Sequence, residues 1–242
     1  IAKHSLEKLA GINADAFTTV SELTARECLQ FHGRKVDEVL PNGFEDQFVP
    51  EAKQYEKKRT SAREKMLQIA TNLTGDQFPK DTLLLATSGR YEFRNKGIDL
   101  FIDALGELNR KERCPGKAVA FILIPANHYG PYKGDMGSER HLTHNLHYEE
   151  QDQILNRIRS NELNNTPDDK VKVIFVPSYL NGNDGIFNLS YYDVLIGLDL
   201  TVFPSYYEPW GYTPLESLAF SVPTVTTTLT GFGLWVSNEY RK

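Results

Sequence analysis

Two kinds of segment alternate along the chain: short runs of hydrophobic residues, and longer segments in which hydrophobic residues recur at helical spacing. Apolar runs of a few residues predict buried strands, and apolar residues at three- and four-residue spacing predict helices with one buried face. The predicted strands are 16–20, 37–40, 82–87, 119–124, 171–176, 198–203 and 222–227. The predicted helices are 1–13, 22–32, 51–73, 98–108, 151–163, 191–198 and 214–220. This alternation predicts an α/β fold, a Rossmann-like, doubly wound parallel sheet with helices on both faces.

The first fifty residues carry a separate strand–helix–strand pattern. Ser21 is a favourable N-cap for the helix 22–32, and Gly33 suits the position that ends it. We expect two domains. Residues 1–48 would be the end of an N-terminal Rossmann-like domain with its hinge, and residues 49–242 a second Rossmann-like domain.

The two ends of the sequence extend this expectation. The chain begins at Ile1 in helix-like sequence and ends at Lys242 soon after a glycine-rich turn. We therefore expect a fragment that lacks most of the first domain and the end of the second. An incomplete first domain should leave an apolar face exposed where its sheet partners would lie.

Composition and charge argue against several classes of function. With 40% hydrophobic and 24% charged residues, the sequence is typical of a globular protein and not of a disordered one. The net charge of −5 argues against a general nucleic-acid binder, and no apolar run is long enough to span a membrane. Cys28 and Cys114 give no disulfide framework, so a reducing cytoplasm is the simplest location.

An aromatic loop follows the predicted strand 198–203. Loops are mostly small and polar, whereas this one carries four large rings. The rings belong to Tyr206, Tyr207, Trp210 and Tyr212. The loop leaves the carboxyl end of a strand and brings backbone N–H groups to the start of a helix. Open α/β sheets bind ligands at such places, and phosphates find free donors there. We expect a site for a flat or sugar-like ligand.

Two glutamates lie on either side of that turn. Thr213 is a good N-cap and Pro214 suits the first helical position, which would make Glu216 the third residue of a capping box. Glu208, before Pro209, can be an ordinary loop carboxylate. From the sequence, each glutamate can therefore have either this structural role or a role in ligand binding.

A second loop carries two cations. The sequence GRYEFRNKG, residues 89–97, follows the predicted strand 82–87 and contains Arg90 and Lys96. Arginine can grip a phosphate with two bonds, and lysine adds a compact charge. At the same edge of the sheet as the aromatic loop, this pair would clamp a phosphate, although such a pair can also be a plain surface feature.

Histidines concentrate in the segment 127–147. The spacing of His141, His144 and His147 could suit a metal ion, but no cysteine or carboxylate pattern accompanies them. We therefore expect a polar surface loop and no metal site.

Several stretches together resemble one enzyme family. FPSYYEPWGYTPLES, residues 203–217, closely resembles the signature of glycosyltransferase family 3, the animal and fungal type of glycogen synthase. Further stretches resemble the same family in the expected order. They are FTTVSELTA at 17–25, PNG at 41–43, GRYEFRNKG at 89–97 and VPTVTTTLTGFG at 222–233. A match of fifteen residues is far more specific than a lone glycine motif.

The resemblance implies a two-domain GT-B glycosyltransferase, with this chain as its donor-binding part. Such a hexosyltransferase would transfer glucose from UDP-glucose to the non-reducing end of an α-1,4-glucan, with retention and without a cofactor. Its partners would be UDP-glucose and glycogen, with no nucleic acid and no membrane. The full-length enzyme could be a homo-oligomer. The isolated fragment should be inactive, because the acceptor side lies outside it.

The resemblance also implies roles for residues of this sequence. Arg90 and Lys96 would neutralise the departing diphosphate without a metal. Glu208 would lie against the donor glucose and be needed for transfer, and Glu216 would take the ribose hydroxyls. The other substrate-binding residues would be Tyr191 on uracil, Trp210, Gly211 and Tyr212 along the sugar, and Tyr212 and Thr213 through their N–H groups on the phosphates. Tyr192 is the alternative register for the stacking tyrosine.

Three other functions stay open from the sequence. The chain could be a nucleotide-sugar-binding module without turnover. It could belong to another retaining GT-B enzyme that uses ADP-glucose, because the choice of uridine rests on the resemblance. A retaining glycosidase could use Glu208 and Glu216 as its carboxylate pair, although their place beside a phosphate-type clamp counts against this reading.

Overall fold

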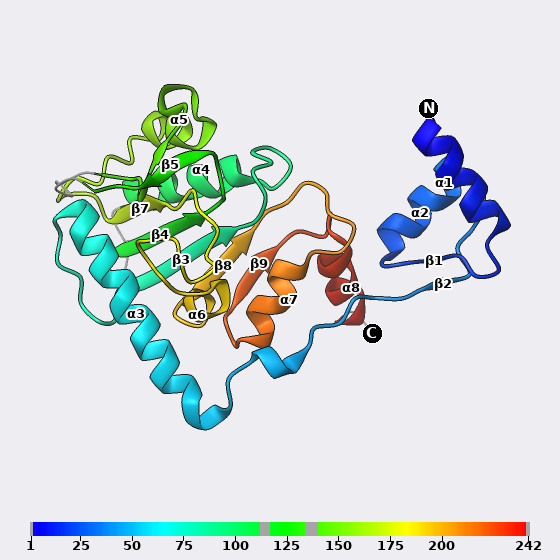
Figure 1. Ribbon diagram of the computed structural model, residues 1–242, viewed down its shortest axis with the longest axis horizontal. Coiled ribbons are helices and arrows are strands. Elements are labelled where there is room, and N and C mark those ends of the chain that lie inside the picture. The colour runs from blue at the N-terminus through cyan, green and yellow to red at the C-terminus, as the bar shows by residue number, and fades with distance from the viewer. Residues whose placement is uncertain (1, 112–116, 134–139, 241–242) are drawn as a thin grey trace.

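A five-stranded parallel sheet forms the centre of the larger part of the molecule (Figure 1). The computed structural model describes residues 2–111, 117–133 and 140–240. The strands are β7 (Val171–Phe175), β4 (Ala118–Leu123), β3 (Leu83–Ser88), β8 (Leu200–Phe203) and β9 (Thr224–Thr226), in that order across the sheet. Since β4 and β8 flank β3 on opposite sides, the direction of strand addition reverses there. A ligand crevice is expected beyond the carboxyl ends of the strands at such a reversal.

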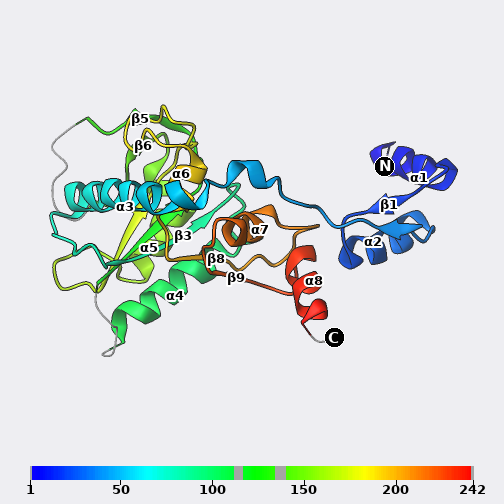
Figure 2. The same ribbon diagram turned by 90° about the horizontal axis from the view of Figure 1, so that it is seen from below.

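Helices cover both faces of this sheet, and Figure 2 shows α3 and α4 on opposite sides of it. The helices are α3 (Ala52–Thr74) and α6 (Tyr191–Leu195) on one face, and α4 (Ile98–Arg110) and α5 (Gln153–Ser160) on the other. Successive side chains of a strand point to opposite faces. Accordingly, Leu84 of β3 belongs to the core beneath α3, and Leu85 to the core beneath α4. The predicted doubly wound α/β fold is confirmed.

The N-terminal residues form a small α/β unit of their own. It consists of α1 (Ala2–Asn13), β1 (Thr18–Thr19), α2 (Glu22–His32) and β2 (Glu38–Val39), with the two strands parallel. α2 has the predicted caps. Ser21 Oγ accepts a hydrogen bond from the N–H of Thr24 at 3.2 Å, and Gly33 ends the helix at φ 73°.

Two short 3-10 helices lie outside this unit. They are η1 (Asp46–Phe48) and η2 (Glu149–Gln151).

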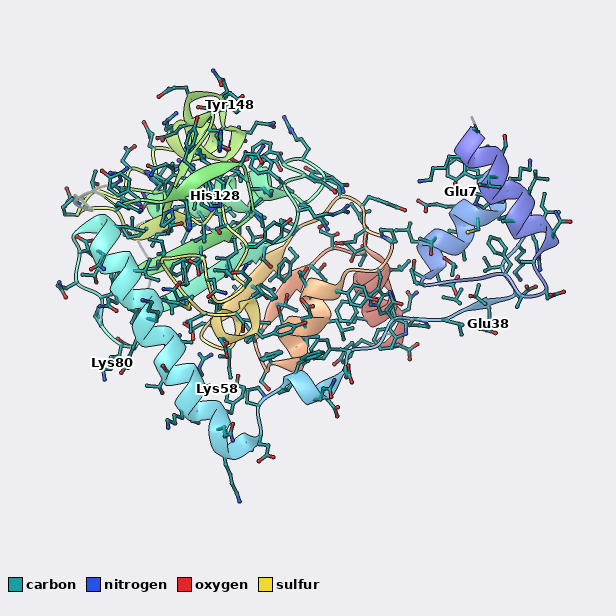
Figure 3. All side chains as sticks on the ribbon, viewed as in Figure 1. Glu7, Glu38, Lys58, Lys80, His128 and Tyr148 are labelled. Carbon is teal, nitrogen blue, oxygen red and sulfur yellow. The ribbon has the colours of Figure 1, made fainter. Side chains whose placement is uncertain are left out.

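This N-terminal unit lies beside the main sheet and not within it (Figures 1 and 3). Its helices expose Leu6, Leu9 and Phe31, with 70%, 59% and 56% of their surface accessible. Exposed apolar side chains are therefore present on both helices of this unit. One contact to the larger part is a hydrogen bond of 2.8 Å from the hydroxyl of Tyr207 to Glu27 Oε2.

The segment 127–147 differs from the polar surface loop that we expected. Its described residues form an antiparallel pair, β5 (His128–Pro131) and β6 (His144–Leu146). His144 is only 1% exposed, and its Nε2 lies 2.8 Å from the backbone oxygen of Asp184. Leu142 and Leu146 join the core beneath α4 and α5. That burial is a tertiary contact, so the polar local sequence gave no sign of it.

Helix α7 (Tyr212–Ala219) begins two residues before the predicted start. Gly211 precedes it at φ 108°, in a region of backbone space that glycine enters easily. Thr213 is therefore not the N-cap, and Glu216 is not a capping-box residue. Pro214 still falls in the first turn, where a missing N–H leaves no helical bond unmade.

Helix α8 (Gly231–Glu239) replaces the glycine-rich turn that the sequence suggested. Thr230 Oγ1 accepts a hydrogen bond from the N–H of Gly233 at 3.1 Å and caps the helix. A Cβ atom on Gly231 would lie 2.1 Å from the backbone oxygen of Pro209. Glycine is required here so that the helix can pack directly against the aromatic loop.

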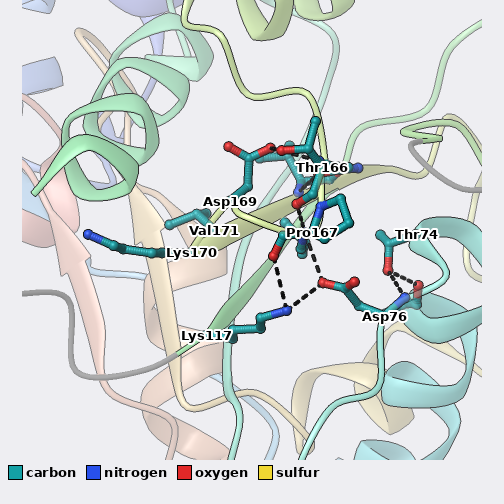
Figure 4. Close-up of polar contacts among 12 residues, drawn as sticks. Thr74, Asp76, Lys117, Thr166, Pro167, Asp169, Lys170 and Val171 are labelled. Atoms are coloured by element: carbon teal, nitrogen blue, oxygen red, sulfur yellow. Dashed lines mark hydrogen bonds and ion pairs between the residues drawn. The ribbon is translucent and has the colours of Figure 1, made fainter. Parts of the chain in front are cut away.

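An ion-pair network around one buried lysine anchors the outer strand β7 (Figure 4). Lys172 on this strand is 0% exposed, and its Nζ lies 2.9 Å from Asp76 Oδ2. Lys117 Nζ lies 2.7 Å from the same oxygen. Burial alone would raise the pKa of Asp76, but the hydrogen bonds from Lys117 and Lys172 outweigh it and hold that pKa below its usual range.

The structure bears on the expectations about the cysteines and about membrane-spanning segments. Cys28 is a free, half-buried thiol, whereas Cys114 lies outside the described residues. Within the described ranges, no helix is long and apolar enough to cross a membrane.

Candidate functional site

A cavity of about 420 Å³ opens where the strand order reverses. Its walls come from the loops after three strands and from the starts of α6 and α7. The lining residues are Ser88 to Tyr91 after β3, Leu123 and Pro125 after β4, Ser178 to Asn181 after β7, Tyr191 of α6 and Thr213 of α7. Parallel strands bring these loops to one edge of the sheet. Residues more than 120 positions apart therefore share one cavity.

The loop 89–97 is fixed against the end of β8 by close backbone contacts. Gly97 has φ +63°, and a Cβ atom on it would lie 2.1 Å from the backbone oxygen of Pro204. The N–H of Tyr206 donates to the backbone oxygen of Asn95 at 2.8 Å. Only glycine combines this conformation with this approach. The contacts bring the cationic loop and the aromatic loop together, as the sequence predicted.

Lys96 and Glu208 form an ion pair between these two loops. Lys96 Nζ lies 2.5 Å from Glu208 Oε1, and the two side chains are only 12% and 21% exposed. The Lys96 stem passes Gly89, which lines the cavity, since a Cβ atom on that glycine would lie 3.9 Å from Lys96 Cδ. A Cβ atom on Gly211 would lie 3.7 Å from Glu208 Oε2. The pair is therefore next to Gly89 in the cavity wall and next to Gly211, the residue that precedes α7.

Arg90 lies at the same cavity but in a looser arrangement. Its guanidinium pairs with Glu92 Oε1 at 3.0 Å, and its side chain is 78% exposed. Both predicted clamp cations are therefore near the cavity, yet each is engaged by a glutamate. Arg90 has the freedom to turn toward a ligand, whereas Lys96 is held in place.

The two neighbouring tyrosines of α6 face different surroundings. Tyr191 lines the cavity, and its hydroxyl lies 2.9 Å from Ser88 Oγ. Tyr192 turns toward α7, where its hydroxyl donates to Glu216 Oε1 at 3.0 Å. Burial raises the pKa of Tyr191, so it is neutral at physiological pH. Of these two tyrosines, Tyr191 is the one that a ligand in the cavity can reach.

Glu216 is half-buried on the first turns of α7. Burial raises the pKa of its carboxyl group, and the hydrogen bond from Tyr192 acts in the opposite direction. Thr213 of the same helix lines the cavity, while Tyr212 is 50% exposed. The helix start therefore presents backbone N–H groups and one carboxylate near the cavity.

Trp210 points elsewhere. It is 4% exposed and packs against Phe232 and Trp235 of α8, with ring centres 5.7 and 6.1 Å away. It lines a different cavity, of 450 Å³, between α8 and the N-terminal unit. The sugar-lining role expected for the Trp210 ring does not match this position. The reason is α8, a helix that the sequence did not predict.

Several cavity residues were missed by the sequence reasoning. Ser88 ends β3 and Asn181 lies in the loop after β7, and both line the cavity. Tyr91 also lines it, and its hydroxyl donates to Asp152 Oδ2 at 2.7 Å. Position at the carboxyl end of a buried strand was the available signal for Ser88. The loop after β7 carried no comparable motif.

The histidines considered as metal ligands make other contacts. His141 Nε2 lies 2.6 Å from the backbone oxygen of Leu163. His147 stacks on Tyr129 with ring centres 3.7 Å apart. In the part of the chain that the structure describes, no three His, Cys, Asp or Glu side chains group as metal ligands.

Comparison with known sequences gives a consistent result. The family model described as glycogen synthase matches residues 1–130 and 139–241. A glycogen [starch] synthase of Neurospora crassa is 32% identical over 302 residues, covering 97% of this chain and 43% of that protein. Isoform 2 of Saccharomyces cerevisiae is also 32% identical, with 98% and 44% covered. The liver enzyme of Rattus norvegicus is 30% identical, with 98% and 43% covered. The chain thus spans less than half the length of these relatives.

Solved structures share the fold at low sequence identity. An Anabaena protein, HepE, in complex with UDP-glucose has a TM-score of 0.56 at 18% identity, covering 95% of this chain and 50% of that one. A sucrose-phosphate synthase of Thermosynechococcus elongatus gives 0.57 at 18%, with 96% and 45% covered. The N-terminal domain of a Candida albicans trehalose-6-phosphate phosphatase gives 0.62 at 14%, with 98% and 49% covered. The likeness shows an α/β fold of the GT-B type.

Proposed function

The chain belongs to the glycogen synthase family, and from this premise we propose that its cavity binds UDP-glucose. In the whole protein, the glucose would be transferred with retention to the non-reducing end of an α-1,4-glucan. The observation that carries the proposal is the ion pair of Lys96 and Glu208, in which the lysine stem passes Gly89 of the cavity wall. It places a cation for a diphosphate and a carboxylate for a sugar side by side.

The shape of the cavity supports one orientation of the donor. Tyr191 offers a ring for uracil at one wall, and Thr213 offers a helix-start N–H for a phosphate at another. Glu216 would take the ribose hydroxyls, since its carboxyl lies on the same helix. Gly211 has no side chain, so the glucose could lie close to the backbone beside Glu208.

The chemistry then follows from charge. As the bond between glucose and diphosphate breaks, negative charge grows on the leaving phosphate oxygens. Arg90 and Lys96 would stabilise that charge, so the step needs neither a metal nor a cofactor. Lys96 already lies against Glu208, and a bound diphosphate would place it between two anions. Glu208 would then stay fixed beside the sugar instead of turning toward the phosphate.

The proposal includes the division of the chain. Residues 1–48 would belong to an acceptor domain and its hinge, and residues 49–242 to the donor domain. GT-B enzymes react in the cleft between two domains, and closure excludes water and aligns the acceptor. We propose a cytoplasmic enzyme whose full-length form could be a homo-oligomer, with no nucleic-acid or membrane partner.

The main competing function is a nucleotide-sugar-binding module without turnover. It draws support from the cavity, where every contact proposed above is to the donor. The glycosidase alternative has less support, because Glu208 pairs with Lys96, a cation suited to the phosphate of a nucleotide sugar. A retaining glycosidase would instead need Glu208 and Glu216 to flank one glycosidic bond.

Glucose transfer separates these functions. The full-length protein and this chain would each be incubated with radiolabelled UDP-glucose and glycogen. We expect incorporation into glycogen by the full-length protein and none by the chain alone, where the acceptor has no fixed position. Absence of incorporation by a folded full-length protein that binds UDP would favour the binding module. Release of free glucose from a chromogenic glucoside would favour the glycosidase.

A further inference from the structure

Glu216 is held by a neighbour outside the cavity, and from this arrangement we propose that Tyr192 is a positioning residue for Glu216. Tyr192 would keep the carboxylate in the orientation that a nucleotide requires, and it would link that orientation to the segment 44–48. The inference rests on the proposed function, because it assumes that Glu216 contacts the nucleotide.

The hydrogen bond gives the first support. Tyr191 and Tyr192 are consecutive residues of α6, so their side chains leave the helix about 100° apart. One therefore faces the cavity while the other reaches α7, where its hydroxyl donates to Glu216 Oε1 at 3.0 Å. The bond occupies one carboxylate oxygen and leaves Oε2 to accept from a ligand. Glu216 can then bind a hydroxyl without losing its own support.

The charge state of Glu216 gives the second support. Burial raises the pKa of this carboxyl, and the bond from Tyr192 lowers it, so the bond favours the ionised form. The pKa of Tyr192 itself is raised to about 12, first by burial and then by Glu216. Tyr191, the neighbouring titratable residue of α6, also feels the charge of Glu216, which raises the pKa of its hydroxyl. Both tyrosines are neutral at physiological pH, so Tyr192 remains a donor throughout that range.

The aromatic ring of Tyr192 gives the third support. It stacks on Phe220 with ring centres 5.0 Å apart, and it meets Phe44 edge-on at 6.0 Å. The ring centre of Phe48 lies 5.7 Å from that of Tyr192 and 6.2 Å from that of Phe44. Phe44 and Phe48 belong to the segment between the N-terminal unit and α3. The position of the hydroxyl therefore depends on where that segment packs.

The key variant is Tyr192→Phe, which removes the hydroxyl and keeps the ring contacts. UDP affinity at neutral pH should fall by about threefold to tenfold, the effect of one lost hydrogen bond. Without the donor, the carboxyl should protonate more readily. The loss of affinity on acidification should therefore begin at a higher pH than in the wild type. A purely structural role of Tyr192 would change stability without moving this pH profile.

The matched control is Tyr55→Phe. The Tyr55 hydroxyl donates to the backbone oxygen of Phe220 at 2.6 Å, so this variant removes a hydroxyl from the same aromatic cluster without touching Glu216. Calorimetric titrations with UDP from about pH 5 to 8 would compare both variants with the wild type. Tyr55→Phe should keep the affinity and the pH profile. A folded Tyr192→Phe protein with wild-type affinity and profile would overturn the inference.

Two further variants test the nucleotide contact of Glu216 and the packing of the Tyr192 ring. Glu216→Gln tests the premise: unchanged UDP affinity in that variant contradicts the proposed nucleotide contact itself. Weaker binding by Glu216→Gln together with an unchanged Tyr192→Phe overturns only the positioning role. Phe44→Leu keeps the hydroxyl but loosens the ring, and it should weaken UDP binding by a smaller factor. If Tyr192→Phe does not fold, unchanged binding by Phe44→Leu overturns the inference.

Discussion

Replacing Lys96 by methionine tests the ion pair at the centre of the site. The substitution keeps the apolar stem but removes the ammonium group, so Glu208, with 21% of its side chain exposed, loses its cation. A charge-assisted hydrogen bond contributes about 1.5–3 kcal/mol, and we expect a loss of stability in this range. The diphosphate also loses a cation, so UDP affinity should fall at least about tenfold, or ~1.4 kcal/mol. Urea unfolding and calorimetric titration with UDP measure the two effects.

The double variant Lys96→Met/Glu208→Gln separates stability from binding. A neutral amide at position 208 no longer needs a cation, so most of the lost stability should return. UDP affinity should stay below that of the wild type, because the phosphate still lacks its lysine. A folded Lys96→Met protein that binds UDP as tightly as the wild type would show that Lys96 does not contact the diphosphate.

The remaining predictions concern three other parts of the molecule. Arg90→Ala should weaken UDP binding by about tenfold with little change in stability, because the side chain is 78% exposed; equal UDP affinity would remove Arg90 from the clamp. In the full-length enzyme, Glu208→Gln should lower turnover with little change in UDP affinity, whereas Glu216→Gln should weaken nucleotide binding; the reverse pattern would exchange the two roles. Asp76→Ala should lower the free energy of unfolding by about 3 kcal/mol, because Lys172 stays buried without its carboxylate. Since the folded pKa of Asp76 is lowered, its stabilisation should be present above about pH 4 and disappear as the pH falls further, so acid titration of stability should be steeper in the wild type than in Asp76→Ala.

Local signals in the sequence predicted much of the fold. Ser21 and Gly33 fixed both ends of α2, because caps depend on a few neighbouring residues. The apolar runs located the five strands of the main sheet, since a strand buried on both faces has few polar positions. Strand ends then indicated where the cavity lies.

The errors arose where distant packing overrides local preference. The conformation of Gly211 starts α7 earlier than its cap pattern predicts. Gly231 permits a helix because the backbone of Pro209 approaches too closely for a side chain. The polar segment around His144 is buried by strand pairing.

The candidate site also has parts that the sequence located and parts that it did not. The two loops with Lys96 and Glu208 could be located from their motifs, but the ion pair between them joins residues 112 positions apart. The bond between Tyr192 and Glu216 spans 24 positions. Neither pairing has a local pattern, so neither could be read from the sequence.

Calorimetric titration of the chain with UDP, and separately with ADP, measures whether the cavity binds a uridine nucleotide. We expect UDP to bind with a dissociation constant in about the micromolar to millimolar range, and ADP to bind more weakly. A folded chain that binds neither nucleotide, or that prefers ADP, would contradict the assignment of the cavity to UDP-glucose.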